Sequence, residues 1–449
     1  MKMAMEGRLR RLHRRDWSGF LNGVVGSGVW QSFLRQIDAG QDPRIRWTGK
    51  YIVICWLAIG WSIQRSLADR FREGRELLCH LFWRRRRPGR SYQGLVKATE
   101  RLGVDVFSKF WSSLRETIPK RLGRLWHWRG WVVMAVDGSR IDAPRTLQNE
   151  SGLGLSGRAK SHPQWWLTWI VHLPSKSIWD WRQGPGNSSE RSHLQQMMGD
   201  LPSQTLLVGD IGFGGFDFLS QLADSGVSFL IRCASNTTLL VESTQQRIER
   251  IGQHWQVYLW PTGRRRKAPL HLRLIVLKRS GRRVYLLTNV MSSERLSRSM
   301  ASEYYAARWG VEVGYRSLKQ TLERRKVLAR TPEAGGMELA GGVLALALLM
   351  LQAAVAMGAR VTELSVAAAL KVIRHVIESL RFGRRDEGFL RRLRCAVKDR
   401  YQRRRSKRAR DWPHKKKEPL PQPPKLRRPT SNEKRRIRAF LNENAMALG

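Results

Sequence analysis

Much of the fold can be worked out from residues 303–323, which read Glu-Tyr-Tyr-Ala-Ala-Arg-Trp-Gly-Val-Glu-Val-Gly-Tyr-Arg-Ser-Leu-Lys-Gln-Thr-Leu-Glu. At about 100° per residue, four polar residues fall on one helix face about 60° wide: Tyr305, Arg308, Glu312 and Lys319. Five mostly apolar residues form a second face: Tyr304, Ala307, Val311, Leu318 and Leu322. The stretch therefore predicts an amphipathic helix with a buried seam. Its polar stripe is either solvated surface or a set of ligand-binding side chains.

The chain carries a large excess of positive charge. It has 82 Lys and Arg against 36 Asp and Glu in 449 residues, a formal net charge of +46. Basic runs occur along its whole length, at residues 84–87, 264–267, 403–410 and 434–438. This excess predicts a polyanionic partner, and nucleic acid is favoured over an anionic membrane surface. The length predicts two or three domains, and the 42% hydrophobic content is enough for a buried core.

Cysteine usage and the apolar stretches indicate a cytoplasmic protein, and the predicted nucleic-acid partner implies association with the nucleoid. Cys55, Cys79, Cys233 and Cys395 lie far apart and form neither a zinc motif nor a disulfide framework. Residues 1–16 are basic without a following apolar segment, so no signal peptide is predicted. Residues 339–357 are long and apolar enough to span a membrane, but they are rich in Ala and Gly. We expect a helix buried against a sheet, and no membrane partner.

Residues 1–125 are predicted to form an independent helical domain that binds DNA. Apolar residues recur at helical spacing in residues 20–37, 51–67 and 106–118, with Arg and Trp interleaved. The alternative is a helical bundle that only packs on the core.

Residues 126–380 are predicted to form an α/β domain with a mixed sheet flanked by helices. The continuous apolar runs 131–136 and 205–209 predict central strands that end at Asp137 and Asp210. The aromatic-rich segments 165–172 and 178–182 predict a hairpin, and 227–232 a further strand. Helices are expected at residues 190–198 and 216–223.

Two segments break this α/β pattern. Residues 236–290 read as polar strands with a basic turn, and predict an inserted β subdomain placed before the striped helix. Residues 381–449 are basic and Pro-rich, and predict a largely disordered tail that adds charge without specificity.

Three carboxylates are candidate metal ligands in this acid-poor chain. Asp137 and Asp210 each follow an apolar strand beside a Gly, and strand ends at one edge of an α/β sheet are common ligand sites. Glu312 projects from the striped helix. Three converging carboxylates suit one or two Mg²⁺ ions, which can activate an attacking oxygen and stabilise a leaving one in phosphoryl transfer. Each aspartate on its own could equally be a turn former.

The spacing Tyr305-x2-Arg308-x3-Glu312-x6-Lys319 resembles the Tyr-Arg-Glu-Lys signature of bacterial insertion-sequence transposases of the DDE class, insertion-sequence-four type. Asp137 in Val-Asp-Gly-Ser and Asp210 in Gly-Asp-Ile-Gly-Phe look like the first and second acidic residues of that family. The resemblance covers residues 131–357, and the segments on either side carry no recognised motif.

This resemblance implies a specific biochemistry. It implies a ribonuclease-H-like core with a β insertion, in which the three carboxylates hold Mg²⁺, or Mn²⁺ in its place. It further implies strand cleavage at the terminal inverted repeats of an element and transfer into target DNA by a homodimer. Tyr305, Arg308 and Lys319 are expected to hold the DNA backbone. Two other classes stay open: a catalytically inactive DNA-binding derivative, and a non-enzymatic basic nucleoprotein.

Several further residues have structural explanations that compete with functional ones. Asp142 is expected to be a turn or salt-bridge residue, and Glu190 a less favoured metal ligand. Three histidines lack metal-ligand spacing and are expected to be structural: His162, His172 and His193. Trp255 and Trp260 could stack on an unpaired base or belong to the core.

Overall fold

The computed structural model describes residues 25–37, 45–82, 87–103, 105–156, 162–241, 254–260, 268–279, 282–381, 388–399 and 422–446. Three of the basic runs lie wholly or mostly outside these ranges, at residues 84–87, 264–267 and 403–410, as do residues 1–16. The chain divides into two compact units. Unit 1 holds residues 1–126, 138–189 and 311–398, and unit 2 holds residues 127–137, 190–310 and 399–449.

The N-terminal part of unit 1 is helical, as its periodicity predicts. Its elements are α2 (Ser27–Ile37), α3 (Gly49–Trp61), α4 (Leu67–Leu81), α5 (Tyr92–Leu102), α6 (Val106–Arg115), α7 (Ile118–Leu122) and η1 (Gly123–Leu125). Nearly every residue of α3 is buried, because this helix is apolar on all sides. It packs between α4 and a later helix, α13 (Pro332–Met357). These helices therefore share one unit with later segments, and do not form the separate compact domain that the sequence suggested.

The rest of unit 1 combines a β-hairpin with helices. Its strands are the end of β1 (Val132–Asp142), β2 (Leu155–Ser156), β3 (His162–His172) and β4 (Ser177–Pro185). Strands β3 and β4 pair antiparallel as predicted, with a register shift at Ile170 and Val171. The helices are α8 (Leu147–Leu153), α12 (Trp309–Arg316, from Val311), η4 (Ser317–Thr321), α13, η5 (Gly358–Glu363), α14 (Val366–Arg381) and α15 (Phe389–Arg394).

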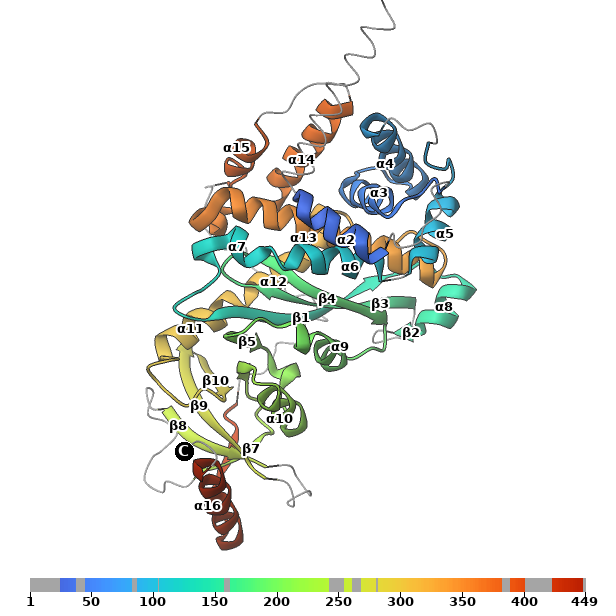
Figure 1. The fold of residues 1–449 in the computed structure, drawn as a ribbon. Coiled ribbons are helices and arrows are strands. Elements are labelled where there is room, and N and C mark those ends of the chain that lie inside the picture. The colour runs from blue at the N-terminus through green and yellow to red at the C-terminus, as the bar shows by residue number, and fades with distance from the viewer. Residues whose placement is uncertain are drawn as a thin grey trace, which may run out of the picture. The chain divides into compact units, whose positions relative to one another are not determined.

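Helix α13 contains the apolar stretch that resembles a membrane span. Among the described residues, the segment 332–363 is the one helical stretch long and apolar enough to cross a membrane. However, 89% of its most apolar window is buried inside the structure. The helix packs against β4 on one side and α3 on another (Figure 1). These contacts account for its composition as that of a core helix buried against a sheet.

Unit 2 is built on a mixed sheet. Its described strands run in the order β11 (Lys425–Arg427), β7 (Thr238–Leu240), β8 (His254–Leu259), β9 (Leu270–Arg279), β10 (Arg282–Thr288), β6 (Ser228–Arg232), β5 (Thr205–Gly209) and the first part of β1. The β1–β5–β6 part is parallel, whereas β6 to β8 pair antiparallel through β10 and β9. Its helices are α9 (Glu190–Met197), η2 (Met198–Asp200), η3 (Ile211–Phe213), α10 (Phe216–Asp224), α11 (Arg298–Ala307) and α16 (Ser431–Met446). The predicted mixed α/β fold class is confirmed.

Two segments of unit 2 differ in detail from expectation. The described strands of residues 236–290 are present, but β10 pairs with β6, so they extend the central sheet. Residues 422–446 are ordered, because β11 adds to the edge of β7 and Ile437 of α16 is fully buried. The prediction of disorder is therefore wrong for this last part of the chain.

Candidate functional site

Asp137 and Asp210 occupy equivalent positions on two neighbouring parallel strands. The register of β1 and β5 matches Ala135 with Val208, and each aspartate lies two residues further along its own strand. The carboxyl ends of parallel strands meet at one sheet edge, where α/β proteins commonly hold ligands. Unit 2 therefore brings these two predicted ligands to the same edge.

The predicted end of the first strand at Asp137 is wrong, because β1 continues to Asp142. The later residues find new backbone partners: Asp142 donates its N–H to the Arg325 carbonyl at 3.1 Å and accepts from the Val327 N–H at 2.9 Å. Backbone hydrogen bonds thus extend the strand beyond the point where the hydrophobic pattern stops. Asp137 lies within a strand, and the division between the two units falls directly after it.

Asp210 is surrounded by three donor side chains of unit 2, from α11, the turn after it, and β6. The Tyr305 hydroxyl donates to Oδ1 at 3.3 Å, Arg308 Nη2 lies 3.6 Å from Oδ2, and Arg232 Nη1 lies 3.6 Å from Oδ1. Both Tyr305 and Arg308 are only 6% exposed, whereas the Asp210 side chain is 34% exposed. These two members of the polar stripe are therefore not solvated surface. Burial, followed by the nearby Asp210 charge, raises the pKa of Tyr305, so its hydroxyl remains a donor.

Sequence reasoning missed residues that shape this edge. Arg232 follows Ile231, the register partner of Gly209, so it occupies the position next to Asp210 on β6. Arg191 of α9 donates to the Gly212 carbonyl at 2.8 Å and holds the turn after Asp210. Glu190 Oε2 lies 3.6 Å from the position that a Cβ on Gly212 would take. The signal for Arg232 was available in the sequence, since it also ends an apolar strand.

The striped helix is less regular than predicted. Residues 298–321 form α11, a turn at Arg308, α12 and the π-helical segment η4, in place of one regular α-helix over residues 303–323. Leu322 donates its N–H to the Ser317 carbonyl five residues earlier, and this wider turn keeps both Leu318 and Leu322 buried. The apolar seam is therefore confirmed, apart from the half-buried Ala307. The simple helical angle does not apply to Lys319.

Glu312 and Lys319 lie in unit 1, and both are half-buried. The Lys319 ammonium donates to Ser139 Oγ at 2.8 Å, two residues beyond Asp137 in sequence. Burial lowers the pKa of Lys319, while the charge of Asp142 opposes that shift. Within unit 1, Lys319 therefore contacts the second half of the strand that carries Asp137.

A buried ionic network fixes the chain just after Lys319. Arg324 is 2% exposed and donates to the carbonyls of Leu322, Ile59, Gly60 and Ser62 at 2.7–3.3 Å. Arg70 Nη1 lies 3.5 Å from Glu338 Oε1, and Glu338 also accepts the N–H groups of residues 328 and 329. Burial lowers the pKa of Arg324 to about 10 and raises that of Glu338. These contacts tie the end of the π-helical segment to α3 and α4.

The structure supports part of a metal-binding arrangement. Two carboxylates at one sheet edge suit a hard cation such as Mg²⁺. In the described residues, however, no group of three or more His, Cys, Asp or Glu side chains is gathered for a metal ion. Asp210 instead faces two guanidinium groups at long distance. The convergence of Asp137, Asp210 and Glu312 on one metal therefore stays a prediction.

Most of the residues that could be either structural or functional have hydrogen-bond or packing partners within the fold. His162 Nε2 lies 3.1 Å from Asp142 Oδ1, consistent with the salt-bridge role expected for Asp142. His172 is 1% exposed, and its two nitrogens bond to Ser175 and to the Trp126 carbonyl. Trp255 is 4% exposed, and Trp260 packs against a small core cluster.

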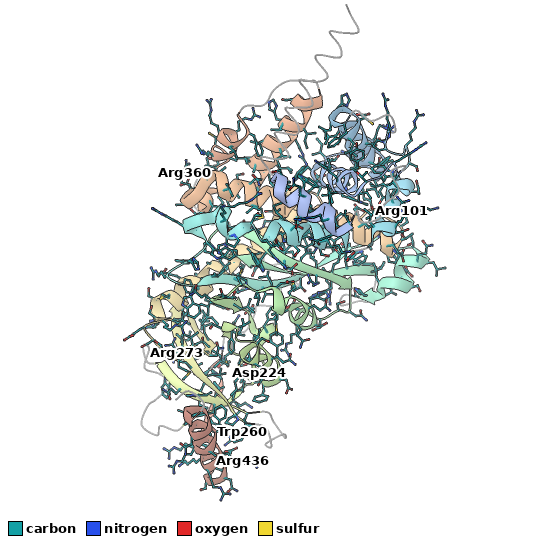
Figure 2. The ribbon with its side chains drawn as sticks, viewed as in Figure 1. Arg101, Asp224, Trp260, Arg273, Arg360 and Arg436 are labelled. Atoms are coloured by element: carbon teal, nitrogen blue, oxygen red, sulfur yellow. The ribbon has the colours of Figure 1, made fainter. Side chains whose placement is uncertain are left out.

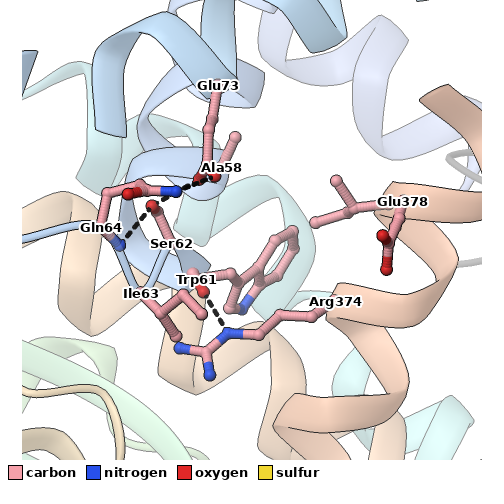
Figure 3. Close-up of a pocket in the computed structure, with 9 residues that line it drawn as sticks. Ala58, Trp61, Ser62, Ile63, Gln64, Glu73, Arg374 and Glu378 are labelled. Carbon is pink, nitrogen blue, oxygen red and sulfur yellow. Dashed lines mark hydrogen bonds between the residues drawn. The ribbon is translucent and has the colours of Figure 1, made fainter. Parts of the chain in front are cut away.

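A separate cavity of about 290 Å³ lies in unit 1 between α3, α4 and α14. Glu73 accepts from Ser62 and Gln64, and Arg374 Nε donates to the Trp61 carbonyl at 2.7 Å (Figure 3). Its described lining contains none of the predicted site residues. The cavity is therefore distinct from the sheet edge that carries the aspartates.

Comparison with known proteins finds a family match and related proteins. Residues 128–348 match the family Transposase DDE domain. The chain is 24% identical over 287 residues to transposase InsG for insertion sequence element IS4 of Escherichia coli strain K12, covering 59% of this chain and 62% of that protein. The chain thus spans about three fifths of the length of this relative. A cryo-EM structure of a piggyBac transposase synaptic complex with hairpin DNA aligns with 85% of this chain and 80% of that chain, at 11% identity and a TM-score of 0.39.

The match over residues 128–348 identifies a transposase DDE domain in this chain. The chain is also similar to a transposase of the IS4 type.

Proposed function

We propose that this protein is an active DDE transposase that cleaves DNA at the ends of a mobile element and joins them to target DNA. The observation that carries this proposal is the in-register placement of Asp137 and Asp210 on neighbouring parallel strands of a transposase DDE domain. Glu312, in the Tyr-Arg-Glu-Lys spacing, supplies the third carboxylate. The parallel β1–β5–β6 order and the β3–β4 hairpin favour a ribonuclease-H-like core.

The three carboxylates would hold Mg²⁺, or Mn²⁺ in its place. When bound, such ions activate the attacking oxygen and stabilise the leaving oxygen of a phosphodiester. Tyr305 and Arg308 are proposed to hold the DNA backbone. Both are buried beside the Asp210 carboxylate, so we infer that they also position it. Lys319 is less buried than Arg308, and its ammonium suits a DNA phosphate.

The partners follow from this chemistry and from the charge. The net charge of +46 matches duplex DNA, with element ends and target as its two substrates. Concerted processing of two ends favours a homodimer, with the N-terminal helices binding the ends. A cytoplasmic, nucleoid-associated location fits a DNA substrate.

The test is Mg²⁺-dependent nicking of a supercoiled plasmid carrying the DNA that flanks the gene. Asp137→Asn, Asp210→Asn and Glu312→Gln should each abolish nicking and leave DNA binding largely intact. The matched control is Asp224→Asn, which removes an exposed carboxylate at the end of α10 in unit 2 (Figure 2). Near-normal nicking by one of the three variants would remove that residue from the site. Absence of nicking by the parent protein, with DNA binding retained, would favour the inactive DNA-binding derivative.

A further inference from the structure

The last described part of the chain is a folded strand and helix that lies outside the matched transposase domain. Strand β11 pairs in parallel with β7, and α16 places Ile437, which is 0% exposed, against Leu240 and Tyr258. Trp260 and Leu441 pack against the same cluster. Figure 2 shows Arg436 on α16 at the same end of unit 2 as Trp260. The segment is therefore a fixed part of unit 2.

Glu433 anchors the start of α16, and its charge is paired with an arginine of the same segment. Arg427 of β11 donates to both Glu433 oxygens at 2.7 and 2.8 Å. Thr430 and Glu433 also form a capping box, since the Thr430 N–H donates to Glu433 Oε2 and the Glu433 N–H to Thr430 Oγ1. The side-chain bonds from Arg427 lower the pKa of Glu433 to about 2. The Glu433 carboxylate therefore pairs with Arg427 and not with the basic residues that follow it in α16.

Those cations occupy the side of α16 that faces solvent. Lys434, Arg435 and Arg438 are exposed. At about 100° per residue, they fall within an arc about 100° wide, on the side away from Glu433 and Ile437. Such an arrangement opposes helix stability in two ways. The cations lie in the N-terminal half of the helix, where the macrodipole is positive, and Lys434 and Arg438 are like charges at i and i+4.

We propose that this cationic face of α16 binds the phosphate backbone of duplex DNA, as a contact surface separate from the aspartate-bearing sheet edge. The proposal rests on the proposed function for its partner, because a transposase must hold DNA beyond the cleaved bond. A row of phosphates offsets both the dipole and the like-charge repulsion. Phosphate contacts position DNA without reading its sequence, so binding here is sequence-independent.

The experiment compares two double variants, both in the Asp137→Asn background, so that binding is measured without cleavage. The test pair is Lys434→Gln with Arg438→Gln. The control pair is Lys371→Gln with Arg391→Gln, which removes two exposed cations from α14 and α15 in unit 1. Affinity for a duplex of arbitrary sequence is measured by fluorescence anisotropy across a salt series. The thermal midpoint of each variant is recorded alongside.

If both side chains contact phosphates, the test pair should reduce the magnitude of the salt slope by about 1.8, or about 0.9 per contact. Its affinity at 0.1 M salt should fall roughly tenfold or more. Its thermal midpoint should not fall, because the removed charges oppose the helix dipole. An unchanged salt slope, or an equal loss in the control pair, would overturn the proposal. Failure of the parent protein to bind DNA at all would instead refute the proposed function.

Discussion

Replacement of Arg324 by Met should be among the most destabilising single changes in unit 1. The guanidinium is 2% exposed and supplies donors to four carbonyls, three of them in residues 59–62 at the end of α3. Its charge also compensates the buried carboxylate of Glu338. Methionine has similar length and fills the space, but it offers neither donors nor charge.

The size of the effect follows from these contacts. Removing one partner of a buried ionic group costs about 3–5 kcal/mol, because the remaining buried charge, here that of Glu338, loses part of its compensation. Arg324→Lys keeps the charge but cannot reach both Leu322 and the end of α3 from one nitrogen. Losing one or two charged hydrogen bonds, at about 1.5–3 kcal/mol each, places the lysine variant between the parent and Arg324→Met.

Urea unfolding followed by tryptophan fluorescence measures this order. Trp56 and Trp61 are suitable probes, since both are buried in α3. The midpoint should fall in the order parent, Arg324→Lys, Arg324→Met. A loss below about 1 kcal/mol for Arg324→Met would refute the network as a source of stability. Equal losses for Lys and Met would show that the fork of donors is unimportant.

Three further predictions concern other parts of the chain. Lys319→Ala should weaken DNA binding about equally across sequences and reduce the magnitude of the salt slope by about one in the same anisotropy assay. Lys319→Arg should restore the slope. An unchanged slope together with unchanged nicking would mean that Lys319 is an ordinary surface residue. The folded-state pKa of Glu433 is lowered to about 2, so its contribution to folding stability is present above the unfolded pKa near 4.3 and is lost as the pH falls toward 2. Thermal midpoints measured across an acid titration should therefore fall more steeply for the parent than for Glu433→Gln. The expected difference in stability is about 1–2 kcal/mol, given the partial exposure of Arg427. Gly60→Ala should destabilise unit 1 by about 1–3 kcal/mol, because a Cβ at this position would lie 2.5 Å from the Cβ of Ala345 in α13. The control Gly28→Ala has open space around it and should leave the midpoint of thermal denaturation unchanged.

The sequence predicts well those elements whose hydrophobic pattern is strong and whose formation depends on neighbouring residues in the chain. The apolar run 205–209 became β5 with the same bounds, and residues 216–223 lie within α10. The two aspartates were found because each follows such a run. Their equivalent register could not be read from the sequence, since strand pairing depends on contacts between distant segments.

The misses have a common physical origin in long-range hydrogen bonding. Strand β1 passes its apolar run because Arg325 and Val327, about 180 residues later, supply backbone partners to Asp142. The π-helical turn at residues 317–321 keeps two leucines in the core at once, which a periodicity of 3.6 does not reveal. Composition predicted a disordered tail, but β11 pairs with β7 and Ile437 is buried in a core cluster, so residues 422–446 include a folded strand and helix.

The close packing of α3 on α13 has a consequence for how the chain is made. The ends of these helices are separated by about 270 residues, from Trp61 to Pro332. At about 5–20 residues per second, α3 leaves the ribosome roughly 15–55 s before α13 exists. For that interval, an almost wholly apolar helix has no partner for the face that carries Gly60. We therefore expect synthesis of this protein to pass through a stage in which that apolar face is exposed and prone to aggregation.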